Sequence, residues 1–251
     1  MNKILISAGL MCLMLAVTIP ATAQGGPTID PGTAIDPAKV GLGPPGTITF
    51  TDGCNAIPDD AYDGTQASMA CFTVPGPDLI IDDINVVIGV NHTWAGDLVY
   101  KVTSPAGTTV TLMSRPGFVE PADDGTGCCG NNADMSSGFP LTYDDSALFD
   151  AENTGASLQV VCQDDGECEF FPNPGAGPGV NLADFIGEDA TGDWQVCAGD
   201  SAGGDAGEIC QADLLIEGAT VPTVPWLGIV ILLAILSAIS LVVMRRRAHN
   251  S

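Results

Sequence analysis

Apolar and polar residues alternate with a period of two through the middle of the chain. The apolar positions that share one side of three extended segments are Ile84, Val86, Ile88 and Val90, then Leu98, Tyr100 and Val102, then Val110 and Leu112. This period is typical of half-buried β-strands. No sustained helical period occurs before residue 221, and only residues 181–186 suit a turn or two of helix. The pattern therefore predicts an all-β fold, an antiparallel sandwich or barrel.

Turn residues separate the extended runs. Ser104-Pro105-Ala106-Gly107 has proline second and glycine fourth, which suits a type I turn, so the flanking runs predict a hairpin. Two later apolar runs, 194–197 and 214–216, flank a Gly- and Asp-rich segment at 199–207 and predict a closing hairpin. Residues 116–138 and 162–179 look like insertions. We expect them to form loops that disulfides tie to the sheets.

Both ends of the chain are apolar. A basic start, an apolar run at 4–17 and the small residues Ala21-Thr22-Ala23 predict a signal peptide over residues 1–23. Residues 226–244 carry no charge, and as a helix they would span about 28 Å, which matches a bilayer core. Three arginines then place a short basic tail, 245–251, in the cytoplasm. We therefore expect an exported protein held by one C-terminal transmembrane helix, with its N-terminus outside the cytoplasm.

Three parts lie between these apolar ends. Residues 24–48 are rich in glycine and proline and predict an extended linker. Residues 49–218 are numerous enough for one domain with a substantial core. Residues 219–225 connect that domain to the apolar run.

The exported part is strongly acidic. All 31 acidic residues lie between Asp30 and Glu217, and only Lys39, Lys101 and Arg115 oppose them there. Such a surface repels nucleic acid and anionic lipid, so neither is an expected ligand. It favours cations, basic partners or simple solubility, and the sequence leaves these alternatives open.

Eight cysteines follow the predicted signal peptide, an even number that is typical of disulfides in an exported chain. No Cys-x-x-Cys pair occurs, so a zinc site has little support. Three local pairs are plausible from their spacing: Cys54 with Cys71, Cys162 with Cys168, and Cys197 with Cys210. The adjacent Cys128 and Cys129 must either pair with each other or cross-link to other segments.

Several short motifs occur in an order that resembles the P/Homo B domain. The residues that carry the resemblance are His92, Thr93, Gly96, Asp97, Leu98, Ser104, Pro105, Gly107, Thr108, Gly192 and Trp194, with Tyr143-Asp144-Asp145 between them. P/Homo B is the β-rich, non-catalytic domain that follows the catalytic domain of kexin- and furin-like proprotein convertases and occurs in bacterial subtilisin-like proteases. The resemblance covers residues 78–218. It implies a jelly-roll β-sandwich of the galactose-binding-like type.

The motif residues have mainly architectural roles in this interpretation. We expect Asp97 to accept backbone N–H bonds in the tight turn before Leu98, with His92 and Thr93 satisfying the other side of that turn. No catalytic residue is predicted, because His92 is the only histidine of the exported part. Residues 64–70 superficially resemble a subtilisin nucleophile segment, but Ser68 falls one residue late. The chain resembles a P domain without its protease, and we expect no enzyme activity.

Aspartates in the predicted loops supply the hard oxygen ligands that Ca²⁺ prefers. The candidate ligands are Asp97, Asp144, Asp145, Asp200 and Asp205. No spacing matches an EF-hand loop. Ca²⁺ is the one cofactor that the sequence suggests.

The C-terminal tail resembles a second family. Val221-Pro222-Thr223, with Gly228 five residues further on, is similar to the IPTL-type sorting signals of Gram-negative bacteria. Those signals resemble tails that exosortases process. Here valine replaces isoleucine and Val224 replaces leucine, so processing by a sorting peptidase and permanent anchoring both stay open. Either outcome places the protein in a bacterial cell envelope or on its surface.

Two functions fit these observations. The first is a calcium-stabilised binding or structural module that meets a protein or a surface glycan. The second is an accessory or stabilising subunit of a separately encoded subtilisin-like serine endopeptidase. An exposed apolar sheet face would favour the second function, because docking buries apolar area, whereas a uniformly acidic surface would favour the first.

Overall fold

A computed structural model of the protein describes residues 47–50, 53–157 and 159–220. Its strands are β1 (Thr47–Phe50), β2 (Asn55–Ile57), β3 (Ala70–Gly76), β4 (Leu79–Asn91), β5 (Leu98–Thr103), β6 (Thr109–Ser114), β7 (Leu141–Tyr143), β8 (Phe149–Asp150), β9 (Glu169–Phe171), β10 (Gly192–Asp200) and β11 (Gly207–Thr220). Four short 3-10 helices join them: η1 (Gln66–Ser68), η2 (Ala95–Asp97), η3 (Ala151–Asn153) and η4 (Leu182–Phe185). The predicted helical turn at 181–186 corresponds to η4. The strands begin at Thr47, inside the predicted linker, and end at Thr220.

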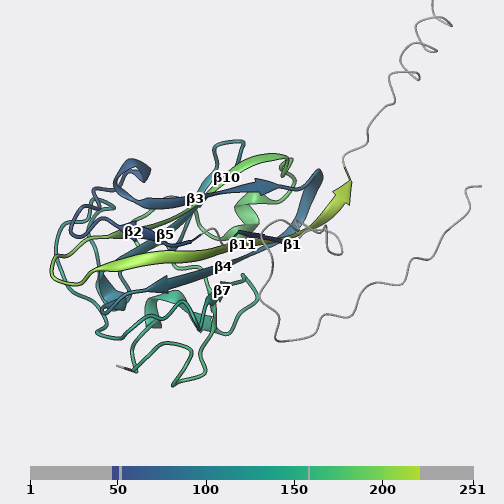
Figure 1. Cartoon of the computed structure of the whole chain (residues 1–251). Coiled ribbons are helices and arrows are strands. Elements are labelled where there is room, and N and C mark those ends of the chain that lie inside the picture. The colour runs from purple at the N-terminus through teal and green to yellow at the C-terminus, as the bar shows by residue number, and fades with distance from the viewer. Residues whose placement is uncertain (1–46, 51–52, 158, 221–251) are drawn as a thin grey trace, which may run out of the picture. The chain divides into compact units, whose positions relative to one another are not determined.

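The strands form two sheets, so the prediction of an all-β protein is confirmed (Figure 1). One sheet has the order β1-β11-β4-β7-β9-β8, with β2 also paired to β11, and the other has the order β3-β10-β5-β6. The prediction of a wholly antiparallel fold is wrong, because β9 pairs in parallel with both β7 and β8. A parallel pair needs a long connection, and 25 residues of loop and short elements separate β7 from β9.

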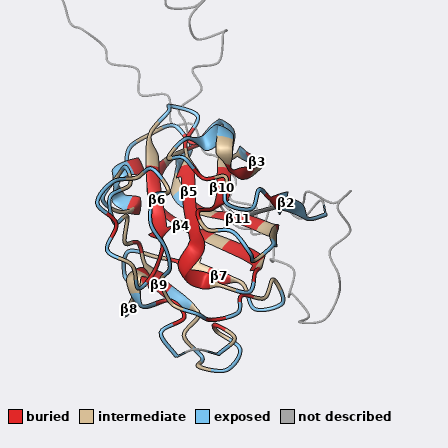
Figure 2. Cartoon of the chain, turned by 90° about the vertical axis from the view of Figure 1, so that its left-hand side faces the viewer, coloured by how far each residue is buried: buried red, intermediate tan, exposed pale blue. Residues whose placement is uncertain are grey.

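Both sheets contribute to one apolar core. The nine alternating positions from Ile84 to Leu112 are all at most 2% exposed, which confirms the predicted inward face of β4, β5 and β6. Figure 2 shows the buried residues along these strands and along β7 and β11, while exposed residues concentrate in the connecting loops. Trp194 packs edge-on against Phe185 at 5.2 Å between ring centroids and donates its ring N–H to Ala190.

The first predicted hairpin is confirmed and the second is wrong. β5 and β6 pair across the turn at 104–107, where the amide of Gly107 donates to the carbonyl of Ser104 at 2.9 Å and Gly107 has a φ of 92°. β10 and β11, by contrast, lie in different sheets. The segment at 201–206 therefore crosses between the sheets instead of turning within one.

The outer side of β5 is covered as well as its core side. Val99 belongs to a second apolar cluster with Tyr62, Met69 and Cys197. Lys101 is buried on the same side, where its ammonium group lies 2.6 Å from Asp123 and 3.1 Å from the carbonyl oxygen of Gly64. The segments around Tyr62 and Asp123 thus form an additional layer over the smaller sheet.

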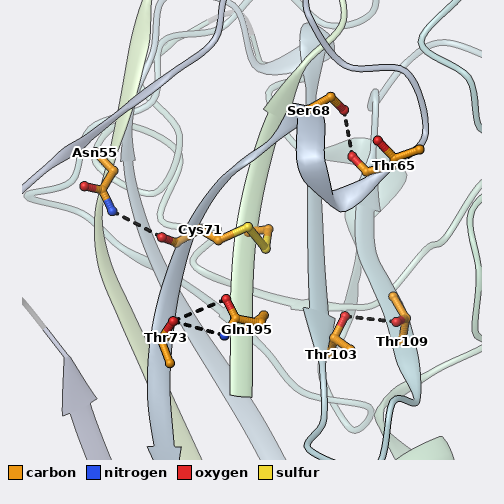
Figure 3. Close-up of a disulfide and its surroundings, with 9 residues drawn as sticks. Asn55, Thr65, Ser68, Cys71, Thr73, Thr103, Thr109 and Gln195 are labelled. Atoms are coloured by element: carbon orange, nitrogen blue, oxygen red, sulfur yellow. Dashed lines mark hydrogen bonds between the residues drawn. A yellow bond between two sulfur atoms is a disulfide. The ribbon is translucent and has the colours of Figure 1, made fainter. Parts of the chain in front are cut away.

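The disulfides differ from the predicted local pairs. Cys71 bonds to Cys197, which lies directly opposite it across β3 and β10, and Cys54 bonds to Cys210 (Figure 3 shows the first of these bridges). The predicted pairs Cys54 with Cys71 and Cys197 with Cys210 are therefore wrong. Spacing along the chain favoured neighbouring cysteines, whereas strand pairing brings Cys71 opposite Cys197 from 126 residues away.

The expectation that disulfides tie the two inserted loops to the sheets is wrong, because each loop's bridge joins two cysteines of that same loop. Cys162 pairs with Cys168 within its own loop, the pair expected from spacing, and Cys128 pairs with its neighbour Cys129. Residues 162–179 also contribute β9 to the larger sheet. Polar contacts hold the other loop: the buried Arg115 guanidinium donates to the carbonyls of Thr126 and Gly127 and stacks on the ring of Phe118 at 4.3 Å.

Several predictions fall on other parts of the chain. The signal peptide (1–23), most of the linker (24–48), the sorting motif at Val221, Pro222, Thr223 and Gly228, the apolar span (226–244) and the basic tail (245–251) lie outside the described residues. Within residues 47–50, 53–157 and 159–220, no helix has the length and apolar character needed to cross a membrane.

Candidate functional site

Three of the predicted calcium ligands meet where two strands end. β4 ends at Asn91, and the chain passes through His92 and η2 to Asp97 before β5 begins. β10 ends at Asp200, and Asp205 lies just before the first residue of β11. The loops after β4 and β10 therefore lie side by side, joined by a backbone hydrogen bond from the amide of Ser201 to the carbonyl of Asp97 at 3.0 Å.

His92 and Asp200 form a buried pair at the centre of these loops. The imidazole Nε2 lies 3.2 Å from a carboxylate oxygen of Asp200, and both side chains are fully buried. The other ring nitrogen lies 3.1 Å from the backbone nitrogen of Trp94 and 3.0 Å from its carbonyl oxygen. The neutral ring can thus accept from the amide of Trp94, and the protonated ring can donate to its carbonyl.

The pKa of His92 reflects two opposing causes. Burial disfavours the charged imidazolium and lowers this pKa, but the hydrogen bond to Asp200, the charge of Asp200 and the backbone of Trp94 together outweigh burial. The net result is a raised pKa for His92. Asp200 uses its second oxygen to accept from the amide of Ala202 at 3.0 Å. Both oxygens of Asp200 are therefore already engaged within the protein.

Asp97 has a buried carboxylate oxygen without a hydrogen-bond partner. The residue is 3% exposed, and its Oδ1 contacts no donor. Burial, followed by the charge of Asp200, raises the pKa of the Asp97 carboxyl to about 6 against the smaller opposing effect of His92. An orphaned acceptor of this kind costs free energy, so it requires an explanation.

Asp97 lines a surface cavity of about 400 Å³. Its remaining walls are formed by Asp60, Trp94, Gly127, Cys128, Cys129, Ser201, Ala202, Gly203 and Asp205. Three aspartates thus line one space, together with residues 127–129 and 201–203 of two loops. Carboxylates and carbonyls are the ligands that Ca²⁺ takes, in sets of six to eight oxygens, so the cavity offers the donor type that a hard cation prefers.

The structure corrects the expected roles of the motif residues. The carboxylate of Asp97 accepts no backbone N–H bond at its Oδ1; instead the carbonyl of Asp97 accepts from Ser201. His92 contacts Trp94 within the turn before Asp97, as expected, and also reaches Asp200 at the end of β10, while Thr93 reaches across to the loop after β10. Thr93 donates its hydroxyl to Asp205 at 2.5 Å.

Asp144 and Asp145 do not join the cavity. Asp144 accepts from the amide of Ser146 within its own turn. Asp145 accepts from the amides of Leu182 and Ala183 at 2.9 and 2.8 Å and so caps the first turn of η4 from a distance. The predicted set of five ligands therefore separates into Asp97 and Asp205 in the cavity wall, Asp200 behind them, and two structural caps.

Sequence reasoning missed Asp60 as a cavity residue. Asp60 adopts a φ of 52°, which aspartate tolerates better than most residues. The next two amides, of Ala61 and Tyr62, donate to the carbonyl of Asp200 at 3.1 and 2.9 Å and hold Asp60 beside the loop after β10. The only sequence signal is the turn-forming Pro58-Asp59-Asp60, which does not indicate its neighbours in space.

A second group of metal-ligating side chains occurs at Cys54, Glu208 and Cys210, whose ligand atoms lie within 4.8 Å of one another. The two cysteines are bonded to each other, so their sulfurs are not available as thiolates. This group is therefore a disulfide beside a glutamate. In the described part of the chain it is also the only group of three such side chains this close together, so the cavity carboxylates are more widely spaced.

Two candidate serine hydroxyl groups are not directed at His92. Ser201 donates its hydroxyl to the carbonyl of Asp97 at 2.9 Å, and Ser68 donates to the carbonyl of Thr65 at 2.7 Å (Figure 3). Among residues 53–157 and 159–220, the hydrogen bonds of the His92 ring go to Asp200 and Trp94 and to no hydroxyl or thiol. An activated serine needs such a bond to its base.

No model of a known protein family matches the chain, and no curated protein matches it. Among solved structures, the chain is similar to the serine protease of Aeromonas sobria in complex with its chaperone, at 16% identity and a TM-score of 0.39. It is also similar to the same serine protease alone, at 16% identity and a TM-score of 0.36. The matches cover 70% and 71% of this chain but only 26% and 28% of those proteins, so the chain spans about a quarter of their length.

Proposed function

We propose that this protein is a non-catalytic, exported P/Homo B-like jelly-roll domain that acts as a calcium-stabilised binding or structural module at the bacterial cell envelope. The observation that carries the proposal is the unpartnered Oδ1 of Asp97, a residue that lines a cavity together with Asp60 and Asp205. A bound Ca²⁺ would supply the missing partner of that oxygen. The bridges between eight cysteines support an oxidising, exported location.

The residues that would hold Ca²⁺ are Asp97, Asp205 and Asp60, with carbonyls of residues 201–203 completing the set. Asp200 would act indirectly, because its oxygens engage His92 and Ala202 and so position the loop. Ca²⁺ would join the loops after β4 and β10 with the segment before Tyr62. Binding to the folded state alone would raise stability, by about 1.4 kcal/mol at ten times the dissociation constant.

The alternative function is an accessory subunit of a separately encoded subtilisin-like endopeptidase. It requires an apolar docking face. The large apolar side chains that are exposed in the described residues are Val119, Phe139, Leu148, Phe149, Val180 and Ile186. All of these lie in loops or in the two-residue strand β8, not along a sheet face. This distribution favours the binding or structural module.

The proposal is tested by thermal unfolding of the full-length protein with millimolar Ca²⁺, with Mg²⁺ and with a chelator. We expect Ca²⁺ to raise the midpoint by a few degrees, and Asp97→Asn to abolish this rise. Asp193→Asn, which changes an exposed aspartate outside the cavity, is the matched control and should respond as the wild type does. A midpoint that Ca²⁺ leaves unchanged would refute the proposed cation site.

A further inference from the structure

Cys128 and Cys129 form a disulfide that faces solvent and lines the cavity of Asp97. Both residues are exposed, whereas each of the other three bridges has at least one half-buried or buried cysteine. Both also belong to the wall that contains Asp97 and Asp205. An attacking thiolate needs access to a sulfur atom, so this bridge is the most open of the four to thiol–disulfide exchange.

Chain stabilisation does not account for this bridge. A disulfide stabilises a fold mainly by restricting the unfolded chain, and the effect grows with the length of the loop that it closes. The other bridges join residues 156, 126 and 6 positions apart, but Cys128 and Cys129 are adjacent. The bridge therefore restricts almost no loop, and its position in the cavity wall becomes the informative property.

The wall that carries the bridge is fastened on both sides. On one side, Arg115 donates to the carbonyls of Thr126 and Gly127, directly before Cys128. On the other side, the amide of Gly96 donates to the carbonyl of Asn131 at 2.9 Å. A Cβ on Gly96 would lie 2.3 Å from the backbone of Gly130, so the two segments are in direct contact. The bridge therefore lies between the residues that Arg115 binds and the turn that contains Asp97.

We propose that Cys128–Cys129 is a thiol–disulfide exchange site whose redox state sets the affinity of the Asp97 cavity for Ca²⁺. This inference rests on the proposed function. A thiolate of a dithiol reductant attacks one sulfur and forms a mixed disulfide, and its second thiol then releases the protein. Two electrons and two protons pass to the protein: Cys128 and Cys129 become thiols, and the dithiol becomes a disulfide. The two side chains then take separate positions in the cavity wall, so the wall no longer keeps one shape and Ca²⁺ binds more weakly.

The experiment uses the full-length protein with dithiothreitol as the dithiol. Graded reduction followed by alkylation and peptide mass mapping shows which cysteines react first, and calorimetry measures the dissociation constant for Ca²⁺ before and after reduction. Cys128→Ser/Cys129→Ser represents the reduced wall, and Cys162→Ser/Cys168→Ser removes a bridge outside the cavity. We expect Cys128 and Cys129 to be labelled first. Their loss should raise the dissociation constant at least about fivefold, the lower end of typical coupling between sites, while the control stays near the wild type.

Two results would overturn the inference. One is that the cysteines of another bridge are reduced and labelled before Cys128 and Cys129. The other is that the dissociation constant for Ca²⁺ is unchanged both in the reduced protein and in Cys128→Ser/Cys129→Ser. A protein that binds no Ca²⁺ in either redox state overturns the proposed cation site itself and with it the coupling. Calorimetry of the oxidised wild type separates that failure from a failure of the redox coupling alone.

Discussion

The carbonyl of Asp97 accepts two hydrogen bonds from Ser201, one from its amide at 3.0 Å and one from its hydroxyl at 2.9 Å. Ser201 directly follows Asp200, so these bonds hold the loops after β4 and β10 together and bring two carboxylates into one buried region. Burial first, and the charge of Asp200 second, raise the pKa of Asp97 to about 6.

The raised pKa predicts that stability without Ca²⁺ falls as the pH rises. The folded state holds the Asp97 proton up to about pH 6, whereas the ordinary value is 3.8. This contribution is complete below about pH 4 and is lost as the pH passes 6, at a cost on the order of 2–3 kcal/mol. The raised pKa of His92 acts in the same direction, and the other charged groups that act on Asp97 are Asp200, Asp205 and Arg115.

Asp97→Asn isolates this effect. The variant cannot ionise at this position, so its stability relative to the wild type should increase between pH 4 and pH 7 in the presence of a chelator. Urea unfolding at several pH values measures the difference. A difference that does not change with pH would show that Asp97 titrates normally in the folded protein.

His92→Gln should be strongly destabilising at neutral pH. It removes the imidazole that lies 3.2 Å from Asp200 and leaves a fully buried carboxylate without the ring that pairs with it. The expected cost is about 2–4 kcal/mol. Thr93→Val, which removes only the bond to the half-buried Asp205, should cost about 1 kcal/mol and serves as the comparison in chemical denaturation. Equal effects of the two changes would contradict a structural role for the His92–Asp200 pair.

Removal of both long-range disulfides should lower the free energy of unfolding by more than the sum of the two single removals. Cys54–Cys210 encloses Cys71–Cys197, and the chain segments between the two bridges are short compared with the separation of 126 residues across the inner one. Either bridge alone therefore keeps the other pair of cysteines near each other in the unfolded chain. Each single removal by alanine should cost about 3 kcal/mol, and the double removal should exceed the sum by about 1–2 kcal/mol. A double-mutant cycle in urea measures this excess, and strict additivity would argue against the nested arrangement.

Gly96→Ala should cost more than Gly107→Ala. The added Cβ at Gly96 would lie 2.3 Å from the backbone of Gly130, which requires a backbone shift and a cost of about 2–3 kcal/mol. Gly107 has open space around its Cβ position, so alanine there meets only the unfavourable φ of 92°, at about 1 kcal/mol. Thermal unfolding of both variants checks the order. The reverse order would mean that the loop at 128–131 does not press on the turn of Asp97.

The period-two pattern was sufficient to predict which face of β4, β5 and β6 is buried, because alternation depends only on local geometry. Pairing between distant strands was not predictable in the same way. The Gly- and Asp-rich segment at 199–207 resembles a hairpin turn, yet Asp200 and Gly207 belong to different sheets. Because β10 and β11 do not pair, Cys197 and Cys210 are not neighbours across a hairpin. Cys197 is bonded to Cys71 instead, and Cys210 to Cys54.

The candidate site shows the same division. Asp97 and Asp205 were predicted from their chemistry and their loops, but Asp60 reaches the cavity only through the bonds of Ala61 and Tyr62 to the carbonyl of Asp200. Asp144 and Asp145 matched the chemistry equally well, and Asp145 instead satisfies the amides at the start of η4. Residue type alone cannot distinguish a carboxylate that accepts backbone hydrogen bonds from one whose oxygen is left without a partner.

The length of β11 gives the cavity a defined orientation. This strand runs across the domain (Figure 1) over 14 residues, so its ends lie up to about 46 Å apart at 3.3 Å per residue. Asp205 precedes its first residue, and Thr220 is its last, immediately before the predicted sorting motif. The loops that line the Asp97 cavity therefore lie at one end of this strand, and the link to the tail lies at its other end.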